Sequence, residues 1–328
     1  MLSRVADSIY WLSRYIERAE NVARFIDVNL HLMLDLPTGT SEQWDPLVQT
    51  TGDVPLFQEH YGTSTQEHVV SFLTFDPKNP NSILSCLRMA RENARSVRQS
   101  ISSEMWEQVN RFYLMASAAA SDGRLVQAPH DVFTEIKMAS HLFVGITDAT
   151  MSHGEGWHFA RLGRLLERAD KTSRILDVKY FILLRSAQDV GTPFDDIQWA
   201  AVLRSASAFE MYRKRHGRIS PRGVVEFLLL DREFPRAIHF SLLAARDSLH
   251  KISGTPLGTF RHAPEKLLGQ LCSDLAFTGV DEIVNAGLHE YFDGLQTRMN
   301  HVGAGIFETF FALKSPKTVK PATQEQAQ

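Results

Sequence analysis

Two stretches of this sequence decide the fold: YWLSRYIERAENVARFIDV at Tyr10–Val28 and ARLGRLLERADKTSRILDV at Ala160–Val178. Eight of their nineteen positions carry identical residues at a constant offset of 150, where average residue usage would give about one. The recurring residues are Leu12, Arg14, Glu17, Arg18, Ala19, Arg24, Asp27 and Val28, repeated at Leu162, Arg164, Glu167, Arg168, Ala169, Arg174, Asp177 and Val178. Both stretches place apolar residues at helical spacing, so the same amphipathic helix is predicted twice.

A second pair of matching segments supports an internal duplication. The matches run from Val70 to Arg91 and from Val225 to Arg246 at an offset of 155. The order of the segments is kept and the offset slips by five residues, as one short loop insertion would produce.

The sequence therefore predicts an all-α helical bundle made of two diverged tandem repeats, residues 1–150 and 151–314, in a pseudo-two-fold relation. We expect one domain over 1–314. The Lys-, Pro- and Gln-rich residues 315–328 have almost nothing to bury and are predicted to be a disordered tail.

Periodicity, Pro positions and N-cap residues predict the individual helices. The predicted ranges are 3–34, 43–50, 65–75, 81–100, 104–121, 129–150, 157–185, 195–215, 220–230, 235–252, 263–277 and 281–313. The segments VVSFLTF and VVEFLLL have strand-like composition but lack alternating partners, and we predict both to be helical.

Composition excludes several classes of protein. The net charge of −3 gives no reason to expect nucleic acid as a partner. No window approaches 18 apolar residues, so no membrane span is predicted. The two cysteines, Cys86 and Cys272, are too few for a disulfide framework, and Cys86 is predicted to be a core residue. A cytoplasmic location follows as the expectation.

The first helix carries an unusual line of polar residues. On a helical wheel Tyr10, Arg14, Glu17, Asn21 and Arg24 form one stripe, while Arg18 lies at the apolar edge beside aromatic residues. The second copy repeats the pattern as Arg164, Glu167, Lys171 and Arg174, with Arg168 at the edge. One interpretation is that these groups form reciprocal ion pairs where the duplicated helices cross. Another is that they form a site.

Four arginines follow one face of the helix predicted at 81–100: Arg88, Arg91, Arg95 and Arg98. Like charges at this spacing repel, so the row calls for an anionic neighbour. Candidates are Glu17, Glu20 and Glu167, or a bound phosphate or carboxylate, because arginine matches their geometry.

Other candidate sites are weaker. Glu155 and His158 have a spacing that bundle metal sites use, but one copy is not enough, and no metal site is predicted. His141 and His301 are expected to be buried packing residues. No Gly-rich phosphate loop is present, so neither ATP nor another cofactor is expected.

Three segments together resemble the alpha-E family, bacterial all-helical proteins named for a Glu-Arg motif. They are MLSRVADSIYWLSRYIERAENVAR (1–24), ARENARSVRQSISSEMWEQVN (90–110) and GWHFARLGRLLERADKTSR (156–174). The resemblance extends over residues 1–313. It implies an association with circularly permuted ATP-grasp ligases and transglutaminase-like peptidases, and a role in making or modifying a peptide or amide-linked metabolite.

Three functions remain open at this point. The first is a partner or accessory protein of an ATP-grasp ligase, in which the arginines bind an anionic group or an acidic partner. The second is an enzyme of amide-bond formation or cleavage, with Glu17 or Glu167 as general base. The third is a structural bundle with internal ion pairs. For the first two, the candidate anion-binding residues are Arg14, Arg18, Asn21, Arg24, Arg91, Asn93, Arg95, Arg98, Arg164 and Arg168.

Overall fold

The structure is a computed structural model that describes residues 1–35, 44–184 and 193–312. These residues form helices and their connections, and no strand occurs among them, which confirms the all-α prediction. The predicted tail at 315–328 lies outside the described residues. Within the ranges described, no helix is both long enough and apolar enough to cross a membrane.

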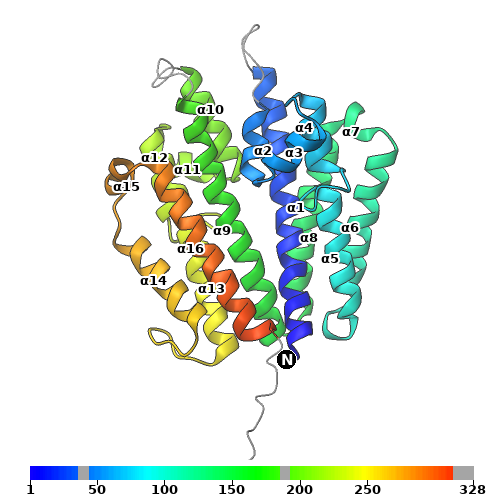
Figure 1. The fold of residues 1–328 in the computed structure, drawn as a ribbon, viewed down its shortest axis with the longest axis vertical. Helices are drawn as coiled ribbons and strands as arrows, with labels where there is room; N and C mark the ends of the chain where they lie inside the picture. The colour runs from blue at the N-terminus through cyan, green and yellow to red at the C-terminus, as the bar shows by residue number, and fades with distance from the viewer. Residues whose placement is uncertain (36–43, 185–192, 313–328) are drawn as a thin grey trace, which may run out of the picture.

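Two long helices, α1 (Ser3–Asp35) and α9 (Glu155–Leu184), lie side by side in the middle of the molecule (Figure 1). The helices before α9 gather around α1 and form what we call the first lobe, whereas those after α9 gather around it as the second lobe. The long helices of the first lobe are α5 (Ile83–Ser96), α6 (Ser103–Ser121) and α8 (Pro129–Thr150). Those of the second lobe are α13 (Ile238–Ser253), α14 (Ala263–Phe277) and α16 (Leu288–Ile306).

Short helices complete both lobes. The first lobe has α2 (Asp45–Thr51), α3 (Val54–His60), α4 (Gln66–Thr74), the 3₁₀ turn Arg98–Ser100 and α7 (Arg124–Gln127). The second lobe has α10 (Pro193–Ser205), α11 (Phe209–His216), α12 (Pro221–Leu230), α15 (Val280–Ala286) and the π-helical turn Phe307–Phe311. Helix α2 packs on α9 and α10 packs on α1, so each lobe also contacts the central helix of the other.

Each lobe has its own apolar core. The first is centred on Leu12, Ile16 and Ala19 of α1, and the second on Leu162, Leu165 and Ala169 of α9. A polar layer separates them where α1 meets α9. The close approach of the two helices depends on Gly163, because a Cβ atom there would lie 2.4 Å from the carbonyl oxygen of Tyr10.

Three predicted helices are interrupted in the structure, and one additional helix follows a predicted one. The helix at 81–100 ends at Ser96 and continues as a 3₁₀ turn, and a separate α3 follows the helix predicted at 43–50. The helix at 195–215 breaks where Ser207 adopts a φ of 51°. The helix at 281–313 breaks at Gly287, whose φ of 96° is readily available to glycine alone.

Other sequence predictions have mixed outcomes. The VVSFLTF and VVEFLLL segments are helical, and Cys86 is fully buried. The prediction that His141 and His301 are buried is wrong: both lie exposed on α8 and α16. The apolar contacts of these helices come from other faces, such as Phe143 and Val302.

Candidate functional site: the Glu–Arg layer and the back groove

Reciprocal ion pairs join α1 and α9. Glu167 accepts hydrogen bonds from Nε of Arg18 at 2.7 Å and from Nε of Arg14 at 2.8 Å. In the opposite direction, Glu17 accepts from Nε and Nη2 of Arg168, both at 2.8 Å. The two carboxylates are almost completely buried. The interpretation of the motif as ion pairs between crossing helices is therefore confirmed in its geometry.

A third buried carboxylate, Glu20, extends this layer toward the second lobe. Arg24 donates to Glu20 from one turn along α1, and Arg236, from the segment before α13, donates to it at 2.7 Å. Arg236 also lies 3.5 Å from Glu17. The exposed His141 approaches Glu20 from α8 at 3.6 Å.

The surrounding arginines hold these carboxylates in the ionised form. Burial alone would raise the pKa of Glu167, but the charges of Arg18 and Arg14 outweigh it, so that this pKa lies well below its ordinary value. Arg168 lowers the pKa of Glu17 against the same burial effect, and Arg236 and Arg24 do so for Glu20. A carboxylate with a lowered pKa is a weak proton acceptor at neutral pH.

The layer is richer in cations than in anions. Four carboxylates face seven arginine and lysine side chains within the described residues. The carboxylates are Glu17, Glu20, Glu167 and Asp170, and the cations are Arg14, Arg18, Arg24, Arg168, Lys171, Arg174 and Arg236.

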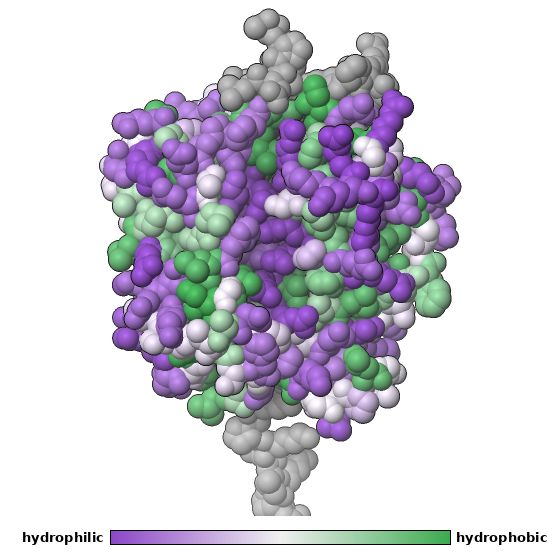
Figure 2. Space-filling model, turned by 180° about the vertical axis from the view of Figure 1, so that it is seen from behind, coloured by the Kyte–Doolittle hydropathy of each residue, from purple (hydrophilic) through white to green (hydrophobic). Residues whose placement is uncertain are grey.

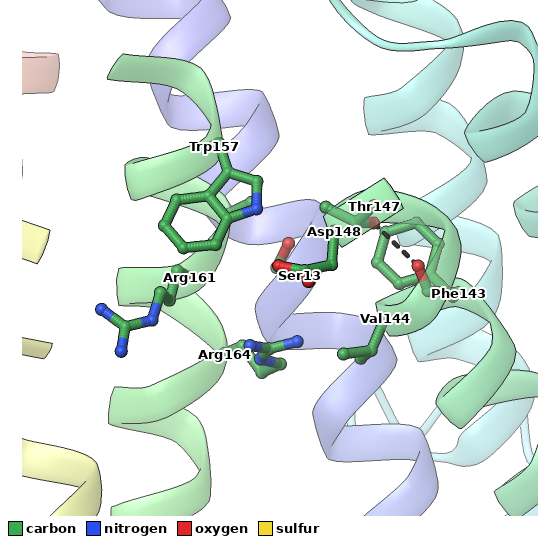
Figure 3. Close-up of a pocket in the computed structure, with 9 residues that line it drawn as sticks. Ser13, Phe143, Val144, Thr147, Asp148, Trp157, Arg161 and Arg164 are labelled. Carbon is green, nitrogen blue, oxygen red and sulfur yellow. Dashed lines mark hydrogen bonds between the residues drawn. The ribbon is translucent and has the colours of Figure 1, made fainter. Parts of the chain in front are cut away.

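Arg164, which the sequence pairs with Arg14 by position, has no such partner. No hydrogen bond or ion pair joins its guanidinium to a residue of the described ranges, and its Nε atom is buried and unsatisfied. Burial, with Arg168 nearby, lowers the pKa of Arg164 to about 10. Figure 3 shows its side chain reaching from α9 toward Ser13 and Val144, with Asp148 and Trp157 close by. These residues line a water-sized hollow between α1, α8 and α9.

A larger hollow of about 470 Å³ lies further along α8. Its charged lining residues are Arg24, Lys137 and Arg204, with Asp27 as the acidic member. Lys137 is paired with Asp27 at 2.5 Å. Arg204 is exposed, and its one contact of this kind with a described residue is the ring of Phe209, 4.9 Å from its guanidinium carbon to the ring centre.

We call these two hollows, together with His141 between them on α8, the back groove. Figure 2, which views the molecule from behind relative to Figure 1, shows a hydrophilic recess down the middle of this face. The linings of the two hollows contain five cationic side chains (Arg24, Lys137, Arg161, Arg164 and Arg204) and two acidic ones (Asp27 and Asp148). The groove is therefore a positively charged surface above the Glu–Arg layer.

A further hollow of about 290 Å³ opens on the other side of the central pair, between α1, α9 and α16. Its arginine, Arg14, is already held: it pairs with Glu167, donates to the Tyr10 hydroxyl at 3.2 Å and stacks on Trp11. Likewise Arg18 lies over the ring of Tyr15, which confirms the expected aromatic neighbour. Asn21 donates to Glu17 at 3.2 Å.

The predicted arginine row lies elsewhere. Glu17, Glu20 and Glu167 pair with other cations, so the expected contact between these acids and the row is not formed. Arg91 donates to Asn110 of α6 at 2.7 Å, Arg95 pairs with Glu92, Arg98 stacks on Trp106, and Asn93 is half-buried on the same helix.

Two aspartate–histidine pairs were missed by the sequence reasoning. His130 lies 2.7 Å from Asp27 and His289 lies 2.7 Å from Asp177. Both aspartates belong to the repeated stretches, but the histidines are more than 100 residues from their partners, and no local spacing connects them. In the sequence, the signal for the first pair is His31, one turn from Asp27.

Glu155, whose spacing to His158 is one that metal sites in helical bundles use, pairs with the N-terminal amine at 2.7 Å.

An all-helical protein with two lobes, joined through a buried layer of glutamate–arginine pairs, is the class that this fold and site define. The profile of the Alpha-E family, described as a predicted alpha-helical domain with a conserved ER motif, matches residues 1–311. The chain belongs to this family.

The similar curated proteins are longer than this chain. Uncharacterized proteins of Mycobacterium bovis and of two strains of Mycobacterium tuberculosis are 24% identical to it over 344 residues. The match covers 98% of this chain and 37% of each relative, so the chain spans little more than a third of their length. No solved structure gives a significant match.

Proposed function

We propose that the protein is an accessory or partner protein in an ATP-grasp-linked system that makes or modifies a peptide or amide, and that it binds an acidic segment in the back groove. The observation that carries this proposal is that Arg24 and Lys137 are neutralised by Glu20 and Asp27, whereas the other three cations of the groove are not paired with an acid among the described residues. Arg164 and Arg204 have no acidic partner in the described part of the chain, so their charges are available to an incoming carboxylate.

The unpaired state of Arg164 is costly without a ligand. Arg164 is half-buried, and its Nε atom has lost its solvation without gaining a hydrogen bond in return. An anion at the mouth of the water-sized hollow would supply the missing interaction. An apolar residue would otherwise be a more stable choice at the edge of a core.

The contacts of Glu17 and Glu167 favour binding over catalysis by these residues. Both oxygens of each carboxylate already accept hydrogen bonds from arginine, and the pKa of each is lowered. A general base needs a free oxygen and a pKa closer to neutral. We therefore assign to the Glu–Arg pairs the task of fixing the lobes, and to the unpaired arginines the task of binding.

The link to ATP-grasp chemistry rests on the family. Alpha-E proteins accompany ATP-grasp ligases and transglutaminase-like peptidases, as the resemblance implied. The relatives carry a similar unit within a chain almost three times as long, which fits a unit that works beside other polypeptide segments. A cytoplasmic location, where ATP and thiols are available, suits this role.

We also propose that the two lobes descend from one duplicated unit in a pseudo-two-fold arrangement. Support comes from the crossed pairs Arg18–Glu167 and Arg168–Glu17, and from the aspartate–histidine pairs with equal distances. Arg14 is paired with Glu167 and Arg164 is unpaired, so the two halves of the site have diverged in their roles.

Binding of a fluorescent decaglutamate peptide, followed by anisotropy at several salt concentrations, tests the proposed groove. We expect saturable binding that weakens with salt and is absent for a decaglutamine peptide. The double variant Arg164→Gln/Arg204→Gln should bind at least tenfold more weakly. Arg222→Gln, which removes an exposed arginine paired with Asp281 on the second lobe, is the matched control and should bind as the wild type does. Equal affinity of the double variant and the wild type would refute the groove.

A further inference from the structure

Three potential metal ligands meet where α1 approaches the beginning of α8. Asp27 and His31 are one turn apart on α1, and His130 is in the first turn of α8. One ligand atom from each lies within 4.8 Å of the other two. The histidine rings face each other with centres 3.8 Å apart, and about half of the His31 side chain is exposed, so the cluster is open to solvent.

The two oxygens of the Asp27 carboxylate have different partners. Its Oδ2 atom pairs with Lys137 at 2.5 Å, while its Oδ1 atom lies 2.7 Å from Nδ1 of His130 and 3.7 Å from Nδ1 of His31. Nδ1 of His31 also donates to the main-chain carbonyl oxygen of Asp27 at 2.8 Å, and this hydrogen bond would have to break for Nδ1 to bind a metal. In a tetrahedral zinc site with bonds of 2.0–2.1 Å, neighbouring ligand atoms lie roughly 3.3 Å apart. The observed separations fall on both sides of this value, so small side-chain movements suffice to form a site.

We propose that Asp27, His31 and His130 bind one divalent transition-metal ion, with zinc as the best fit. Two imidazole nitrogens and one carboxylate oxygen are a ligand set typical of zinc, and the fourth position is then left to water or an anion. That position faces the 470 Å³ hollow, whose lining includes Asp27 and His31. Bound metal would fasten α1 to α8 and would add one more positive charge to the back groove.

Lys137 and Arg24 lie beside the cluster and disfavour a dication. Lys137 partly neutralises Asp27 through the other carboxylate oxygen. We therefore expect an affinity in the micromolar range, weaker than that of structural zinc sites, which bind with all-protein ligands and no neighbouring cation.

The second lobe supplies a matched control. His289 lies 2.7 Å from Asp177, as His130 does from Asp27, but the residue one turn after Asp177 is a phenylalanine, Phe181, which is a residue type without a ligand atom. Replacement of His289 therefore removes a similar aspartate–histidine contact without removing a member of the three-ligand cluster.

Isothermal titration calorimetry with zinc ions on the untagged full chain tests the proposal. We expect one site per chain in the wild type, an affinity at least tenfold weaker in His31→Ala and His130→Ala, and no change in His289→Ala. Circular dichroism and urea midpoints show whether each variant is folded, and His130→Gln serves as a second variant if His130→Ala is not. Absence of saturable binding to the wild type, or wild-type affinity in folded variants at positions 31 and 130, would overturn the site.

Discussion

Removal of one charge from the Glu–Arg layer gives a strong test of its structural role. In Glu167→Gln the side chain keeps nearly the same shape, but one amide oxygen replaces two carboxylate oxygens. In the wild type, Arg18 donates to Glu167 at 2.7 and 3.1 Å, Arg14 donates to it at 2.8 Å, and Lys171 lies 3.7 Å away. The substitution therefore leaves three cationic groups around a neutral, fully buried amide.

The expected loss of stability is large because the Glu167 carboxylate is fully buried. Breaking a buried ion pair by removing one partner costs about 3–5 kcal/mol, a large part of the roughly 5–15 kcal/mol that stabilises a typical domain. The free energy of unfolding, measured by urea denaturation and linear extrapolation, should fall by that amount in Glu167→Gln. Glu17→Gln should behave similarly, since Arg168 and Arg236 then lose their acid.

An exposed pair of comparable geometry provides the control. Arg222 donates to Asp281 at 2.7 and 2.8 Å, but both side chains are largely exposed. Asp281→Asn should therefore cost less than about 1 kcal/mol. If Glu167→Gln destabilised the protein no more than Asp281→Asn does, the layer would not hold the lobes together, and the structural assignment of the Glu–Arg pairs would be wrong.

Three further predictions concern the same region. Gly163→Ala should destabilise the protein by about 1–3 kcal/mol through overpacking against Tyr10. Gly269→Ala on α14, where a Cβ meets nothing within 4 Å, should instead stabilise the protein by about 0.5–1 kcal/mol. The midpoints of urea denaturation distinguish the two outcomes. Arg164→Gln should leave the free energy of unfolding unchanged or raise it, because no ion pair is lost, and a loss above about 2 kcal/mol would show an unseen partner. The pKa of Glu167 is lower in the folded state than its ordinary value of 4.5, so the unfolded chain takes up protons more readily. The contribution of Glu167 to the free energy of unfolding should therefore be fully present above about pH 4.5 and should be lost as the pH falls below it. Urea titrations between neutral and acidic pH should show this loss, and the fall should be less steep in Glu167→Gln.

Helical content and the crossing of α1 with α9 were predictable because they depend on local periodicity and repeated charges. Glu17 and Arg18 recur in the second stretch as Glu167 and Arg168, and charges repeated on two similar helices suggest mutual pairing. Helix breaks were less predictable. Ser207 carries no sequence signal for its positive φ; the helix ends there in a local cap, in which Ser207 N–H donates to Arg204 and Ala208 N–H donates to Leu203.

The binding surface was only partly predictable. Arg164 is a candidate from its position in the motif, but its lack of a partner is not visible in the sequence, because Glu17 is held by Arg168 and by Arg236 of a distant segment. Proximity of His130 to Asp27 is also a product of the fold, since α8 returns along α1. The arginine row was assigned acidic neighbours that the fold gives to other cations, because a helical wheel shows one face of one helix and not what it meets.

Arginine footprinting tests most directly where an acidic ligand binds. The protein is treated with phenylglyoxal with and without decaglutamate, and the modification of each arginine is measured by mass spectrometry. The groove arginines Arg164 and Arg204 should become protected by the peptide, while the exposed Arg88 and Arg95 of α5 should react equally in both samples. Protection of Arg88 and Arg95 without protection of Arg164 and Arg204 would contradict the account and would place the acidic ligand on the first lobe's outer face.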